Sequence, residues 1–132
     1  MKLLLDTHTL LWAIGKTNEL SEKAVHEIKN SNNEVLASAV SLWEIALKYS
    51  IGKLIIEFEV KNIPEYCKNM GFMLIPLEPS DAINSLQLPQ KNDHKDPFDR
   101  MLIYQCIHYN YVLVSKDPKI KNYTKDGLKY IW

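Results

Sequence analysis

The sequence predicts an α/β fold, a three-layer α/β/α sandwich around a mainly parallel sheet of four to five strands. Short apolar runs alternate with segments of helical periodicity from the first residues to the last. The runs are continuous and do not alternate with polar residues, which is typical of parallel strands covered on both faces. The chain has 132 residues, 46% of them hydrophobic, so we expect a single domain over residues 1–132.

The predicted strands and helices follow one another along the whole chain. We expect strands at residues 2–5, 34–37, 72–75 and 111–115, and an edge strand at 129–132. We expect helices at residues 9–14, 21–30, 64–70, 80–86 and 117–123, and one from Ser38 or Ser41 to residue 48 or 49. Ser80 is the expected cap of the helix at 80–86. Residues 88–95 are expected to form a polar loop, and residues 54–60 fit either a loop or a short helix.

The last long helix has the clearest start. Proline is favoured at the first helical position, where its missing N–H would be unpaired anyway, so the helix begins at Pro97. Asp96 is then the N-cap, and its carboxylate accepts from free backbone N–H groups. Asp99 lies in the first turn, near the positive end of the helix dipole.

Four acids occupy similar places in this arrangement. Asp6 and Asp117 follow the ends of predicted strands, and Glu44 and Asp99 lie near the starts of helices. In parallel α/β sheets, ligands bind beyond the carboxyl ends of the strands. We therefore expect these four carboxylates to converge at that edge.

Converging carboxylates need a cation, because each negative charge raises the pKa of its neighbours. Oxygen ligands suit Mg²⁺ or Mn²⁺, whereas zinc prefers histidine and cysteine. Ions held in this way can activate a water and stabilise the leaving oxygen at phosphorus. The predicted chemistry is therefore phosphodiester hydrolysis.

Four segments resemble the motifs of the PIN-domain family, in order and across essentially the whole chain. They are residues 4–12 (LLDTHTLLW), 41–48 (SLWEIALK), 94–103 (HKDPFDRMLI) and 113–117 (LVSKD). Within that family the chain looks most like the VapC-type toxins of bacterial toxin–antitoxin pairs. The resemblance implies an Mg²⁺- or Mn²⁺-dependent endoribonuclease that forms a homodimer and is blocked by a small antitoxin. By motif match, Asp6, Glu44 and Asp99 would be the metal-binding catalytic acids, with Asp117 completing the quartet.

Each acid also has a purely structural interpretation. Asp6 could bond turn N–H groups at the end of its strand, and Asp117 could cap a short helix. Asp99 could be only a favourable charge in the first turn of its helix. Glu44 could close a capping box with Ser41, although it is free to face the site if Ser38 is the cap.

Five further side chains are candidates for supporting roles or substrate contact. For Asp96, helix capping is a sufficient explanation. Thr7 and Ser115 could bond neighbouring carboxylates, and His94 could contact phosphate, assist proton transfer or be structural. Arg100 could reach a substrate phosphate, but its i, i+4 spacing favours a pair with Asp96.

Composition limits the other possibilities. Lys and Arg total 16, as do Asp and Glu, so any contact with RNA must come from a local basic patch. Two cysteines without metal spacing, Cys67 and Cys106, indicate reduced core thiols. No signal peptide or membrane span is visible, so we expect a cytoplasmic protein without membrane contact.

Two other functions are considered. A haloacid-dehalogenase-like phosphatase would use Asp6 as nucleophile but needs a second acid two residues later, where this chain has His8. A catalytically inert binding module would keep the fold and act through a protein partner. The presence of all four acids argues against it.

Overall fold

The computed structural model describes residues 1–132 and contains one five-stranded sheet in the order β3-β2-β1-β4-β5. Every neighbouring pair of strands is parallel. The strands are β1 Lys2–Leu5, β2 Glu34–Ser38, β3 Met73–Ile75, β4 Val112–Val114 and β5 Lys129–Ile131. The predicted parallel sheet is confirmed, and its last strand does lie at an edge.

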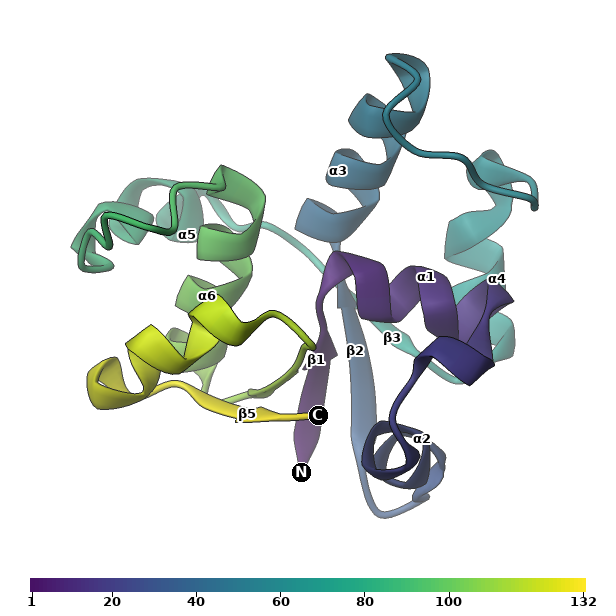
Figure 1. Cartoon of the computed structure of the whole chain (residues 1–132), viewed down its shortest axis with the longest axis horizontal. Coiled ribbons are helices and arrows are strands. Elements are labelled where there is room, and N and C mark those ends of the chain that lie inside the picture. The colour runs from purple at the N-terminus through teal and green to yellow at the C-terminus, as the bar shows by residue number, and fades with distance from the viewer.

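Helices cover both faces of this sheet. The α-helices are α1 Thr7–Gly15, α2 Glu22–Lys29, α3 Ala39–Ser50, α4 Ile63–Asn69, α5 Pro79–Asn84 and α6 Pro97–Tyr109. Short 3-10 segments are η1 Thr17–Glu19, η2 Val60–Asn62, η3 Ser85–Gln87 and η4 Pro118–Asp126. In Figure 1, α1, α2 and α4 lie on one side of β1 and β2, and α5 and α6 lie on the other. No helix is both long and apolar enough to cross a membrane.

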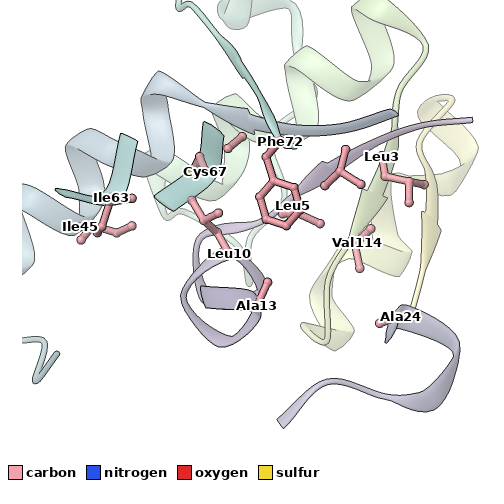
Figure 2. Packing of buried hydrophobic residues seen from close by; sticks show 12 residues of the cluster. Leu3, Leu5, Leu10, Ala13, Ala24, Ile45, Ile63, Cys67, Phe72 and Val114 are labelled. Atoms are coloured by element: carbon pink, nitrogen blue, oxygen red, sulfur yellow. The ribbon is translucent and has the colours of Figure 1, made fainter. Parts of the chain in front are cut away.

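The central strand β1 shows why the apolar runs are continuous. Leu3 and Leu5 pack into a cluster with side chains of α1, α2 and α4 (Figure 2). Leu4, between them, packs into a second cluster with side chains of α6 and η4. Successive side chains of a strand point to opposite faces. A strand covered on both faces therefore needs an apolar residue at every position.

Three helical segments begin at the carboxyl edge of the sheet. Asp6 follows β1 and caps α1, accepting from the Thr9 N–H at 2.9 Å. Ser38 ends β2 and caps α3, accepting from the Val40 N–H at 3.1 Å. Asp117 follows β4 and caps η4. Each crossover thus places a polar side chain at the same edge.

A buried polar network braces this edge from the α6 side. Ser38 Oγ donates to Gln105 Oε1 at 2.8 Å, and Gln105 Nε2 donates to Pro76 O at 3.2 Å. Gln105 Nε2 also lies 3.4 Å from Asp81 Oδ2, and Tyr109 OH donates to Asp81 Oδ1 at 2.7 Å. Gln105 and Asp81 are buried in full or almost so. The network ties the start of α3 to α5 and α6.

Replacing Ser38 with alanine should lower the free energy of unfolding by about 2 kcal/mol, because it removes a helix cap and the buried donor to Gln105. Ser21→Ala is the matched control, since Ser21 caps α2 through the Ala24 N–H outside this network. That change should cost about 1 kcal/mol. Urea unfolding measures both, and equal losses would mean that the bond to Gln105 adds nothing to the cap.

The predicted cap at Ser80 is wrong. α5 begins at Pro79, and Glu78 is its N-cap residue. The favourable position of proline at a helix start, which located Pro97 correctly, also explains this start.

Two other boundaries differ from expectation or choose between alternatives. α1 begins at Thr7, two residues earlier than expected, because Asp6 caps it directly. Residues 54–59 form no helix or strand, which agrees with the loop alternative. Cys67 and Cys106 are free and buried, as predicted.

Candidate metal-binding active site

The predicted acids converge at the carboxyl edge of the sheet. Asp6, Asp99 and Asp117 line one small cavity together with Ser115, and apolar side chains of α6 and β4 close its inner wall. Glu44 lies near enough for its charge to raise the pKa of Asp99. Residues far apart in the sequence thus meet in one place.

Asp6 is half-buried at the end of β1. Burial raises the pKa of its carboxyl group, and hydrogen bonds from Ser115 and Thr9 oppose that effect. The bond to Thr9 is the helix cap, so the structural role considered for Asp6 is present. The same carboxylate also lines the cavity with Asp99 and Asp117. The expected contact of Ser115 with a carboxylate is also present.

Glu44 lies in the second turn of α3 and is only 3% exposed. The Thr7 hydroxyl donates to Glu44 Oε1 at 2.5 Å and lies 3.1 Å from Ser41 Oγ. Lys48 pairs with the other carboxylate oxygen. Because Ser38 is the cap, the proposed capping box with Ser41 does not form, and the Glu44 carboxylate bonds Thr7 and Lys48 instead.

The two aspartates before and after Pro97 have different surroundings. Asp96 caps α6 as predicted, accepting from the Asp99 N–H at 2.9 Å, and its Oδ2 lies 4.0 Å from Lys48 Nζ. Burial is the largest cause that raises the pKa of Asp99 to about 7. The charges of neighbouring acids add to it: Asp96, Glu44, Asp6 and Asp117.

Asp117 joins the cluster from the far side. It caps η4 by accepting from the Lys119 N–H at 2.9 Å, and its own N–H donates to Ser115 Oγ at 3.1 Å. The structural role considered for Asp117 is therefore present, and its carboxylate still lines the cavity.

His94 lies inside the site. Residues 88–95 form a loop, as expected, but two of its side chains are buried, because His94 is 3% exposed and Leu88 is 5% exposed. His94 Nε2 lies 3.5 Å from Asp99 Oδ2 and 3.9 Å from Asp117 Oδ2, without a hydrogen-bond partner. Burial lowers the pKa of His94, which favours a neutral ring.

Arg100 does not pair with Asp96, and that prediction is wrong. Its guanidinium donates to the carbonyl oxygens of Leu88 at 3.1 Å and Pro89 at 3.0 Å, and to Tyr123 OH at 2.9 Å. The bonds to Leu88 and Pro89 hold the 88–95 loop against α6. No local sequence pattern links Tyr123 to this site, because it lies 23 residues from Arg100.

Comparison with known protein families shows which family this chain belongs to. The model of the PIN domain family matches residues 3–126. The chain belongs to the PIN domain family. All four motif segments noted in the sequence lie within the matched residues.

Similar proteins span the whole length of this PIN domain. Ribonuclease VapC22 from Mycobacterium tuberculosis is 24% identical, covering 98% of this chain and 97% of the relative. VapBC2 from Rickettsia felis, solved bound to a DNA fragment from its promoter, has a TM-score of 0.70 at 19% identity, covering 99% and 98% of the two chains. VapBC-1 from nontypeable Haemophilus influenzae has a TM-score of 0.69 at 15% identity, covering 99% and 97%. These structures share the fold.

The residues of this PIN domain fit a divalent cation. Their donors are carboxylate oxygens, which suit Mg²⁺ and Mn²⁺. Burial and then the charges of the neighbouring acids raise the pKa of Asp99, and a cation would offset both effects. One carboxylate oxygen of Asp99 and one of Asp117 lie within 4.8 Å of each other, a spacing that one ion could bridge, and His94 Nε2 lies beside both.

Proposed function

We propose that this chain is a metal-dependent endoribonuclease that hydrolyses RNA phosphodiester bonds and acts as the toxin of a toxin–antitoxin pair. The observation that carries the proposal is the convergence of Asp6, Glu44, Asp99 and Asp117 at one edge of a PIN-domain sheet. The name of the full-length relative, Ribonuclease VapC22, supports the choice of RNA as substrate.

In this proposal the four acids hold Mg²⁺ or Mn²⁺. A bound ion supplies an activated water and stabilises the charge that develops on phosphate oxygens. The chain's own residues keep the ligands in place: Thr7 fixes Glu44, and Ser115 bonds Asp6 and the backbone N–H of Asp117. A carboxylate of the cluster helps to orient the attacking water or to accept its proton.

Asp96 and Arg100 do not contact substrate in this proposal. Asp96 acts as a helix cap beside Lys48, and Arg100 acts as an anchor of the 88–95 loop. Their bonds in the structure already account for both side chains. RNA binding then depends on other basic groups, and Lys116 is a candidate because it stands in the sequence between two cavity-lining residues, Ser115 and Asp117.

A cognate antitoxin and a second copy of the chain are the proposed protein partners. The VapBC names of the similar structures support the antitoxin. Exposed apolar side chains on and after α3 support a protein contact: Trp43 is 62% exposed, Leu47 40% and Ile51 57%. Their i, i+4, i+8 spacing places them on one face. Light scattering of the purified chain tests the homodimer.

Incubation with total bacterial RNA tests the enzymatic proposal. The protein is mixed with Mg²⁺ or Mn²⁺ and then with EDTA, beside Asp6→Ala, Asp99→Ala and the control Glu65→Ala, which removes an exposed acid from α4. Discrete fragments that require metal and both aspartates, but not Glu65, are expected. A folded protein that neither cleaves RNA nor binds Mn²⁺ would favour the inert binding module.

A further inference from the structure

A chain of hydrogen bonds leads from Arg100 to the acids. Arg100 Nη1 donates to Tyr123 OH at 2.9 Å, and Tyr123 OH lies 3.0 Å from His94 Nδ1. The opposite ring nitrogen, Nε2, faces Asp99 and Asp117. Tyr123 has no exposed surface and His94 is 3% exposed, so water does not compete for these atoms.

The direction of each bond follows from the donors present. A guanidinium can only donate, so Tyr123 OH accepts from Arg100. The phenol then has one proton of its own, and the acceptor within reach is His94 Nδ1. If Nδ1 carried the proton instead, the buried phenol proton would have no acceptor, which is unfavourable. A neutral imidazole whose Nδ1 accepts carries its proton on Nε2.

We propose that Arg100 and Tyr123 fix His94 as its Nε2–H tautomer, so that this N–H lies between Asp99 and Asp117, with Nε2 3.5 and 3.9 Å from their Oδ2 atoms, and positions their carboxylates for the cation. His94 is thus a positioning residue and not a metal ligand. The inference rests on the proposed function, because it takes these acids as ligands. Hydrogen bonds to ligating carboxylates orient them and tune the site.

The fixed tautomer also bears on which metals the site accepts. Imidazole nitrogen with a free lone pair is a good ligand for Zn²⁺ and other transition metals. A proton on Nε2 removes that lone pair from the site, which leaves oxygen donors alone to face the cation. Hard ions such as Mg²⁺ and Mn²⁺ suit such a set. The buried Tyr123 hydroxyl would therefore set metal preference from outside the cluster.

The tautomer can be observed directly, without any RNA. Nitrogen NMR of the metal-free protein distinguishes Nδ1–H from Nε2–H, and Nε2–H is expected for His94. A proton on Nδ1 would overturn the inference. Tyr123→Phe keeps the ring that fills the core and removes the hydroxyl. It should raise the affinity for Zn²⁺ relative to Mg²⁺ by about tenfold, and an unchanged ratio would contradict the proposed role of the hydroxyl.

Two His94 variants separate a donor from a ligand. His94→Leu should weaken Mn²⁺ binding by about 10–100-fold, measured by calorimetry. His94→Gln, which keeps an N–H donor, should restore most of the affinity. His108→Leu, at the exposed end of α6, is the control for loss of a histidine. Equal losses for Leu and Gln would overturn the inference in favour of a ligand.

These readouts do not depend on the nuclease. A protein with the Nε2–H tautomer and with the expected order of Mn²⁺ affinities, but without RNA cleavage, would support this inference and contradict the proposed substrate. Cleavage of RNA by a protein whose His94 carries its proton on Nδ1 would support the proposed substrate and contradict this inference.

Discussion

Replacing Asp99 with asparagine is expected to slow RNA cleavage by about 10³-fold or more, as loss of a central catalytic group does in other enzymes. Asparagine has nearly the same shape, so the first turn of α6 should stay intact. The change removes one negative charge and a carboxylate oxygen from the centre of the cluster, where four other acids act on it. Cleavage of bacterial RNA at saturating Mn²⁺ measures the rate, and circular dichroism checks the fold.

The same substitution three residues earlier is the matched control. Asp96 caps α6 through the Asp99 N–H, and asparagine caps helices as well as aspartate does. Asp96→Asn should therefore slow cleavage far less than Asp99→Asn does, because it keeps the cap and removes no carboxylate that lines the cavity. Wild-type cleavage by Asp99→Asn, or equal losses for both variants, would contradict the assignment of Asp99 as a ligand.

The sequence predicted the acids because their positions follow from local signals. Asp6 and Asp117 follow apolar runs, and Asp99 follows a proline that defines a helix start. Once the strands are known to be parallel, their carboxyl ends lie at one edge. Glu44 needed one more fact, namely which serine caps α3. The structure shows that Ser38 is the cap, because its hydroxyl accepts from the Val40 N–H.

The groups around the acids could not be predicted in this way. Gln105 bonds Ser38 from 67 positions away, and His94 meets Tyr123 from 29 positions away. No local periodicity links such pairs. The i, i+4 rule pairs Arg100 with Asp96 because it considers only the helix itself. The guanidinium instead donates to the carbonyl oxygens of Leu88 and Pro89 in the packed loop. The Asp96 carboxylate already accepts from the Asp99 N–H as the helix cap.

The metal-free protein is expected to lose stability as pH rises from about 4 to about 7, because Asp99 has a folded pKa of about 7 against an ordinary value of 3.8. A raised carboxyl pKa means that the folded state holds the proton more tightly. Its stabilising contribution is complete below pH 3.8 and is lost as pH passes 7. Asp99→Asn lacks this loss, so at pH 8 it should be the more stable protein.

The expected gap at pH 8 is about 1 kcal/mol, or about 3–5 °C in Tm, after a discount for the partial exposure of Asp99. Near pH 4 the gap should close. Mn²⁺ should reverse the order at pH 8, since an ion at a hundred times its Kd adds about 2.7 kcal/mol to the protein that binds it. Thermal unfolding with and without Mn²⁺ measures all of these changes.

The sign of this result distinguishes two roles for one carboxylate. As an acid in the first turn of α6, Asp99 would stabilise the helix through its dipole, and its removal would lower Tm at pH 8. As a member of the cluster, its carboxylate is disfavoured at pH 8 by burial and by the charges of its neighbours, and its removal should raise Tm. The dipole is worth about 0.3–1 kcal/mol at exposed sites, and burial together with the charges of several acids opposes it here. A variant that gains stability while losing Mn²⁺ binding would show that Asp99 is kept for the cation and not for the fold.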